Sequence, residues 1–177
     1  MLKKRVIPIL QLNDDELVKS IKYKNHKYVG DPINVVRIFN EIQVDEIILL
    51  DVFQSKKSLD LNYEIIKDIA DECRMPFTYG GGIKNLDQVE KLFSLGVEKI
   101  SINTSALENH EFIKTLSKVF GSQSIVVSVD IKKDFFGKRK LYNWKKNKML
   151  SEDIQDQIRK YVEFSHATMI FSNGFGH

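Results

Sequence analysis

The sequence lacks the features that mark secreted, membrane-spanning and nucleic-acid-binding proteins. Its 177 residues include one cysteine, Cys73, which excludes an internal disulfide and fits a reducing cytoplasm. The apolar run that follows Arg5 stops at Gln11, too early for a signal peptide, and no later run could span a membrane. Its 27 basic and 24 acidic side chains leave a net charge of +3, too small an excess to indicate nucleic acid. We therefore expect a cytoplasmic protein with no membrane and no nucleic acid among its partners.

What the sequence does contain is a regular alternation of apolar runs and amphipathic segments. With 42% hydrophobic and 29% charged residues, the chain can bury a core as one domain. Short apolar runs predict strands at residues 5–10, 45–51, 75–79, 98–103, 124–130 and 167–172, and the polar stretch after the first of them predicts a loop. Helical spacing predicts helices at residues 33–42, 61–73, 85–96, 110–121 and 151–164. Asp31 and Ser151 are the predicted caps of the first and the last, and Gly96 and Gly121 are predicted to end the third and the fourth. Residues 133–148 are typical of a polar hairpin that turns at Gly137, and Cys73 of a small buried hydrophobic side chain at a helix end.

The order of these elements indicates the fold class. Strict alternation of strands and helices predicts an α/β fold, and strands that are apolar throughout predict a parallel sheet buried on both faces. An internal repeat, in which "VIPILQL" (6–12) matches "IVVSVDI" (125–131), favours a (β/α)₈ barrel of the TIM type. Within a single domain, residues 1–121 would form the first half-barrel and residues 122–177 would begin the second. Completing the second half would take about 70 further residues, so we expect a barrel truncated after its sixth strand.

Three consecutive glycines, Gly80, Gly81 and Gly82, follow the third predicted strand, where ligands bind in α/β folds. Without Cβ atoms, they would let backbone N–H groups approach an anion near a helix N-terminus. The polar cluster 103–105 follows the fourth strand and adds amide and hydroxyl donors. The pattern favours a phosphate site, although a tight strand-to-helix turn without a ligand would use glycines in the same way.

Several blocks of the sequence, in order and at matching spacing, resemble the cyclase subunit of imidazole glycerol phosphate synthase, the HisF family. They are "KRVIP", "VDEIILLD", "PFTYGGGI", "EKISINT" and "FGSQSIVVSVDIK". The resemblance implies a (β/α)₈ barrel that receives ammonia from a glutaminase partner (HisH-like), docked as a heterodimer at the amino-terminal face. It implies a reaction at the opposite face, where a phosphorylated substrate, PRFAR, becomes imidazole glycerol phosphate and AICAR in histidine biosynthesis. It implies no cofactor and no metal.

Carried over by position, the resemblance implies three groups of site residues. The family's second catalytic aspartate matches Asp130, its first is replaced by Gln11, and a lysine of its mobile first loop matches Lys19. The positions that line the ligand cleft or hold one phosphate are Asp51, Gly80, Gly81, Gly82, Ser101, Asn103 and Thr104. The charged positions around the ammonia entrance are Arg5, Glu46 and Lys99, while the family's fourth, a glutamate, falls near Ala167.

Gln11 changes what such a site can do. Ring closure with carbon–nitrogen cleavage suits two separated carboxylates, whereas a glutamine holds a hydrogen bond without titrating near neutral pH. Losing one acid–base partner costs about 10²–10⁴ in rate. The sequence also resembles an offshoot of the family that has "LQL" at this strand end and supplies ammonia to a separate sugar amidotransferase in surface-polysaccharide (lipopolysaccharide) synthesis. We expect the same divergence here, with that amidotransferase as a further partner.

Two other interpretations stay open. The single-substrate isomerase of histidine synthesis (HisA-like) shares the half-barrel ancestry, but it also relies on an aspartate where this chain has Gln11. A non-catalytic barrel fragment would leave its first and sixth strands as open edges, and would associate or recruit a partner. The hairpin around Phe135 and Phe136 is most simply a solvated excursion, and we assign it no role.

Overall fold

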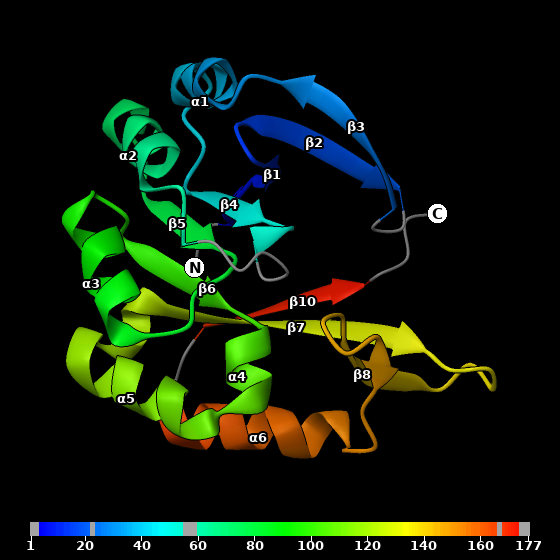
Figure 1. Ribbon diagram of the computed structural model, residues 1–177. Helices are drawn as coiled ribbons and strands as arrows, with labels where there is room; N and C mark the ends of the chain where they lie inside the picture. The colour runs from blue at the N-terminus through cyan, green and yellow to red at the C-terminus, as the bar shows by residue number, and fades with distance from the viewer. Residues whose placement is uncertain (1–3, 22–23, 55–59, 166–167, 174–177) are drawn as a thin grey trace. The chain divides into compact units, whose positions relative to one another are not determined.

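The computed structural model describes residues 4–21, 24–54, 60–165 and 168–173 (Figure 1). Its contacts divide the chain into two compact units. The first comprises residues 1–20 and 25–100, and the second comprises residues 21–24 and 101–177. Strands alternate with helices in both units, so the prediction of a mixed α/β fold is confirmed.

A sheet flanked by helices forms the first unit. Its strands include β1 (Ile9–Asn13), β4 (Ile47–Asp51) and β5 (Phe77–Gly80), with β6 (Lys99–Ile102) next in order. Its helices are α1 (Pro32–Glu41), α2 (Tyr63–Glu72) and α3 (Leu86–Ser94). β4 pairs in parallel with β1, where Leu10 lies opposite Leu49, and with β5, where Ile48 lies opposite Thr78. Ile48 and Leu49 are 4% and 1% exposed, so β4 is covered on both faces, as its continuous apolar run predicts.

The signals that begin and end these helices are local, and most were predicted correctly. The Asp31 carboxylate accepts the backbone N–H of Asn34 at 2.9 Å and caps α1, as predicted. Gly96 and Gly121, predicted to end two helices, have φ angles of 97° and 84°, which other residues rarely adopt.

The predicted cap of the last helix is wrong. α6 (Ile154–Ser165) begins three residues after Ser151. Asp153, directly before the helix, accepts the N–H of Gln155 on its carboxylate at 2.8 Å. An aspartate satisfies the first N–H groups as well as a serine does, so the nearer of the two candidate residues sets the helix start.

An antiparallel hairpin occupies the segment after β1 that the sequence suggests as a polar loop. β2 (Glu16–Ile21) pairs with β1, where Leu12 lies opposite Leu17, and β3 (Lys24–Gly30) follows it at the edge of the sheet. Asp14 makes the turn with a φ of 54°. Leu17 and Val18, two of the apolar residues in this mostly polar segment, are 2% and 8% exposed. Burial of their side chains stabilises the strand, so the prediction of a loop here is wrong.

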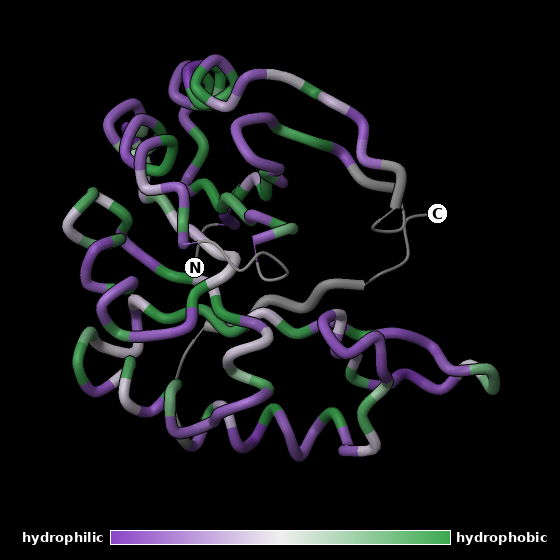
Figure 2. Tube along the Cα trace, viewed as in Figure 1, coloured by the Kyte–Doolittle hydropathy of each residue, from purple (hydrophilic) through white to green (hydrophobic). Residues whose placement is uncertain are grey.

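β7 (Ile125–Lys133) is the longest strand of the second unit. It pairs in parallel with β10 (Thr168–Asn173) and antiparallel with β8 (Arg139–Asn143), which in turn pairs with β9 (Lys148–Met149). The helices of this unit are α4 (Thr104–Glu108), α5 (His110–Phe120) and α6. The predicted hairpin between β7 and β8 is confirmed, with Gly137 at the turn (φ 78°). Figure 2 shows this hairpin as hydrophilic along its arms and hydrophobic at its turn.

The closed barrel stays a prediction, because the pairings among the described strands do not by themselves join into a ring. The division into half-barrels at residue 121 likewise stays a prediction. Among the helices of the described segments, none combines the length and the apolar character needed to cross a bilayer.

Candidate functional site

A cluster of charged residues lies at the amino ends of the strands of the first unit. One carboxylate oxygen of Glu46, which directly precedes β4, accepts hydrogen bonds from Arg5 Nη2 at 2.9 Å and from Lys99 Nζ at 2.7 Å. The other oxygen accepts the hydroxyl of Thr78 at 2.8 Å. We refer to Arg5, Glu46, Thr78 and Lys99 as the gate cluster. The three charged residues that the sequence predicts at this edge are therefore brought together.

Backbone hydrogen bonds place the members of the gate cluster side by side. Next to Arg5, the N–H of Val6 donates to the carboxylate of Asp45 at 2.7 Å, and the N–H of Asp45 donates to the carbonyl of Val6 at 3.2 Å. Next to Lys99, the N–H of Glu98 donates to the carbonyl of Phe77 at 2.9 Å. Arg5, Glu46 and Lys99 thus each follow or precede, in sequence, a residue whose backbone is held by these hydrogen bonds between neighbouring segments.

Glu46 is a buried carboxylate, 3% exposed, that shares its charge between two cations. Burial alone would raise the pKa of Glu46, because it disfavours the charged form. Hydrogen bonds from Lys99 and Thr78, together with the charges of Lys99 and Arg5, outweigh burial and hold the pKa below its ordinary value. The carboxylate is therefore ionised at neutral pH, and the cluster carries two positive charges and one negative charge.

At the carboxyl ends of the same strands, the triple glycine packs against the loop that follows β4. A Cβ added at Gly81 would lie 2.3 Å from the backbone oxygen of Asp51, and one at Gly82 would lie 2.5 Å from the side chain of Gln54. Their φ angles, 120° and 68°, also favour glycine. The Asp51 carboxylate accepts the N–H groups of Phe53 at 3.2 Å and of Gln54 at 3.0 Å. Close packing between protein segments thus accounts for these two glycines, and the phosphate role stays a prediction.

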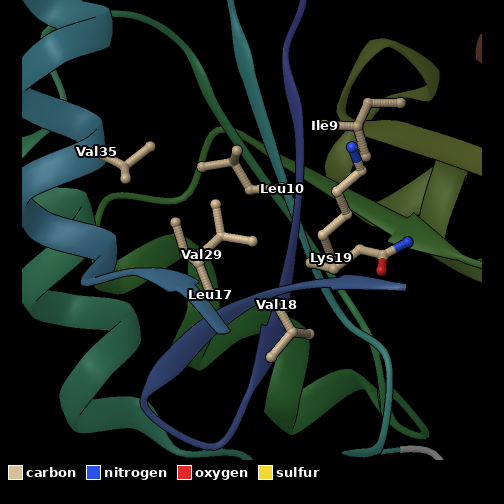
Figure 3. Close-up of a pocket in the computed structure, with 8 residues that line it drawn as sticks. Ile9, Leu10, Leu17, Val18, Lys19, Val29 and Val35 are labelled. Carbon is tan, nitrogen blue, oxygen red and sulfur yellow. The ribbon is translucent and has the colours of Figure 1, made fainter. Parts of the chain in front are cut away.

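Gln11, at the position of the family's first catalytic aspartate, and Lys19, matched to the family's mobile first loop, line the same hollow of about 340 Å³ (Figure 3). The other lining residues are apolar and come from β1, β2, β3 and α1: Ile9, Leu10, Leu17, Val18, Val29 and Val35. Gln11 lies opposite Val18 in the β1–β2 pairing, and Lys19 follows Val18 on β2. Lys19 thus belongs to the hairpin that replaces the predicted loop, and the hairpin brings it to the same part of the sheet as Gln11.

Comparison with known proteins identifies the family. The Histidine biosynthesis protein family matches residues 5–173. A Pseudomonas aeruginosa protein provisionally named imidazole glycerol phosphate synthase subunit hisF2 is 54% identical over 94% of this chain and 64% of its own length. A Leptospira borgpetersenii protein provisionally named imidazole glycerol phosphate synthase subunit HisF is 42% identical over 98% of this chain and 68% of its own length. The Streptococcus sanguinis imidazole glycerol phosphate synthase subunit HisF is 31% identical over 98% of this chain and 69% of its own length.

The chain belongs to the HisF family. It spans about two thirds of the length of these HisF relatives. The resemblance drawn from the sequence blocks is therefore confirmed at the level of the family.

In the second unit, two of the predicted HisF site residues contact each other. The side-chain amide of Asn103 donates to the carboxylate of Asp130 at 2.8 Å. Asn103 precedes α4 but makes no side-chain cap there, so its amide is directed to the predicted catalytic aspartate instead of the helix. Ser101, on β6, is 4% exposed, and Thr104 is the first residue of α4. Asn103, predicted only to line the cleft or hold a phosphate, therefore orients the predicted catalytic residue Asp130.

Thr78 is the site residue that sequence reasoning missed. It lies inside an apolar run, and a lone threonine there is typical of a strand. The predicted parallel sheet was a usable signal. Parallel pairing of β4 with β5 brings the Thr78 hydroxyl near Glu46, at the start of β4. Cys73, predicted to be a small buried side chain at a helix end, follows α2 and is half-buried. Burial, aided by the charge of Glu72, raises the pKa of its thiol to about 12. Ala167 lies outside the described residues. Within them, no three His, Cys, Asp or Glu side chains are placed to hold a metal ion.

Proposed function

We propose that this chain is the synthase-side subunit of a glutamine amidotransferase. It takes ammonia from a HisH-like glutaminase subunit at the edge of the sheet that carries the gate cluster, and passes it toward the edge where the strands end. This edge-to-edge arrangement follows from the parallel pairing of β1, β4 and β5, which puts all their amino ends together.

The gate cluster is the observation that supports this proposal most directly. A buried carboxylate is held by three donors at the amino ends of the strands, where burying an ion is costly unless it is well paired. The side chain of Glu46 is 4% exposed and that of Lys99 is 25% exposed. Lys99 can therefore move into water, while Glu46 stays fixed by Thr78 and Arg5. Such a movement would open a path for a small neutral molecule.

The resemblance to HisF implies that Asp130 supplies one catalytic carboxylate and that Gln11 offers an amide in place of the second. We infer that the reaction of the HisF family, the conversion of PRFAR to imidazole glycerol phosphate and AICAR, is weakened by this replacement, because an amide cannot take or give a proton at neutral pH. The ammonia then serves an acceptor bound elsewhere, which we propose is a sugar amidotransferase of lipopolysaccharide synthesis.

The test is turnover of PRFAR with an ammonium salt, compared between the parent chain and Gln11→Asp. Restoring the second carboxylate is expected to raise the rate by about 10²–10⁴. Gln11→Glu is the matched control, because it adds a carboxylate one methylene too far along the side chain. Asp130→Asn in the Gln11→Asp background should remove the gain. A parent chain that turns PRFAR over as fast as Gln11→Asp would refute the divergence.

Delivery of ammonia is tested separately from the acceptor reaction. With a HisH-like glutaminase added, glutamine hydrolysis and transfer of the amide nitrogen are measured for the parent and for Lys99→Met, which leaves Glu46 without its closest cation. Nitrogen should then escape to the solvent instead of being transferred, and added ammonium should restore transfer. Equal transfer from glutamine by both proteins would refute the role of the gate cluster.

A further inference from the structure

The turn between β7 and β8 carries two aromatic side chains that contact almost nothing. Phe135 is 98% exposed and Phe136 is 90% exposed, whereas most phenylalanines in folded proteins are buried. Their rings lie 5.7 Å apart, edge to face, at 88° to each other. The turn lies at the far end of the hairpin from α5 and α6 (Figure 1). These two rings form a small apolar surface that the rest of the described chain does not cover.

The backbone of this turn is held firmly beneath the rings. The Asp134 carboxylate accepts the N–H groups of Phe136 at 3.0 Å and of Lys138 at 2.9 Å. The Asp134 N–H donates to the carbonyl of Lys138 at 2.8 Å, and Lys140 contacts the same carboxylate at 3.5 Å. The rings are therefore presented by an ordered turn, and little conformational entropy is lost when a partner binds them.

The arms of the hairpin are strongly basic. Between residues 132 and 148 the chain has eight lysines and arginines and one acidic residue, Asp134. Lys145 and Lys146 are directed away from the turn, because both contact Glu108 of the same unit, at 3.2 and 3.3 Å. The cations next to the rings, on both arms, are the exposed residues Lys133, Lys138 and Arg139. Figure 2 shows the result: a hydrophobic turn between hydrophilic arms.

We propose that this hairpin binds an anionic lipid surface, with Phe135 and Phe136 in the boundary between headgroups and acyl chains. An apolar insertion and a basic patch are the two signals that together give stable attachment to a membrane surface. Lys133, Lys138 and Arg139 would then lie at the level of the headgroups. Attachment of this kind needs no spanning segment, and it is separate from the proposed ammonia transfer.

The arrangement of the rings favours lipid over a folded acidic partner or a nucleic acid. A protein pocket that enclosed both rings would also have to enclose the cations on each side, whereas a fluid headgroup layer accommodates apolar and charged groups at once. Binding of single-stranded nucleic acid uses aromatic rings spaced along a basic groove, and here both rings are at one point.

The experiment is flotation of the purified chain with vesicles of phosphatidylcholine alone, or mixed with phosphatidylglycerol. We expect binding to the mixed vesicles only, and release of the chain when salt rises from about 0.1 M to about 1 M. Lys133→Gln, Lys138→Gln and Arg139→Gln, combined, should weaken binding about 100-fold, which is about fivefold for each cation. Phe135→Ser and Phe136→Ser should each weaken it about tenfold.

The matched control replaces Lys114, Lys118 and Lys160, exposed lysines of α5 and α6, by glutamine. This control variant loses three positive charges, as the triple hairpin variant does, and should still bind the mixed vesicles. The proposal is overturned if the parent chain does not float with the mixed vesicles, if it binds both kinds of vesicle alike, or if the hairpin and control variants behave the same. Circular dichroism establishes that each variant is folded, and the ammonium-dependent assay reports separately on the proposed function.

Discussion

Replacing Glu46 by glutamine tests how the gate cluster is held. The change keeps the size of the side chain but removes the charge that Arg5 and Lys99 both contact. Removing one partner of a buried ion pair costs about 3–5 kcal/mol when the other charge stays buried. Here the cations can regain water, since the side chains of Arg5 and Lys99 are 49% and 25% exposed. We therefore expect Glu46→Gln to lower the free energy of unfolding by about 2 kcal/mol at neutral pH.

This loss should depend on pH in one direction. Although burial raises the pKa of Glu46, contacts within the gate cluster more than offset it and hold the pKa below the ordinary value of 4.5. The folded protein therefore keeps this carboxylate charged to a lower pH than the unfolded chain does. Stabilisation by the charge is complete above the unfolded pKa and is lost as the pH falls through the folded pKa. The difference between parent and variant should be constant near neutral pH and should vanish in strong acid.

Urea unfolding followed by circular dichroism, repeated across this pH range, measures the difference directly. Glu90→Gln, at an exposed position of α3, makes the same chemical change outside the cluster and should have almost no effect at any pH. Equal stability of parent and Glu46→Gln at neutral pH would refute the reasoning. So would a loss that persists unchanged in acid, because it could not come from the charge.

Three further predictions concern single contacts, each measured as the free energy of unfolding in urea. Gly81→Ala should cost about 3 kcal/mol or more, because the new Cβ would meet the Asp51 carbonyl. Gly137→Ala is the control: a Cβ there would have nothing within 4 Å, and the change should cost only about 1 kcal/mol. Equal costs for the two variants would contradict the packing argument. Thr78→Val should cost about 1–3 kcal/mol, because one carboxylate oxygen of Glu46 loses its hydrogen-bond donor. Thr78→Ser, which keeps the hydroxyl, should retain most of the parent's stability. A serine variant as unstable as the valine variant would show that the hydroxyl is unimportant. Asp31→Ala should cost about 1 kcal/mol through loss of the α1 cap, and a neutral result would mean that the cap is replaced by water.

The features predicted correctly from the sequence are those whose causes are local or repetitive. β4 is a continuous apolar run because both of its faces are buried, and that pattern is visible in the sequence without knowledge of its neighbours. The cap at Asp31 and the glycine ends at Gly96 and Gly121 depend on the conformation of a few adjacent residues. The grouping of Arg5, Glu46 and Lys99 at one edge of the sheet is what the family resemblance implies, whereas the burial of Glu46 is visible only in the structure.

The features that sequence reasoning missed depend on which segments meet in space. β2 is a strand because Leu17 and Val18 are buried against β1 and its surroundings, and two apolar residues in a polar segment are too weak a signal by themselves. Thr78 meets Glu46 only because β4 and β5 pair in one particular register. Gly81 closely approaches Asp51, 30 residues earlier in the sequence, and the sequence does not predict this contact.

The chain has one tryptophan, Trp144, and it lies on the β8 side of the basic hairpin. Its ring is 4.6 Å from that of Tyr142, and the ammonium group of Lys132 is 5.8 Å from its centre. Excitation at the red edge of the indole band therefore addresses a single chromophore, and its emission reports on this hairpin. Any event that moves Lys132 or changes the polarity around the hairpin should shift that emission, so the protein carries a built-in optical reporter that requires no label.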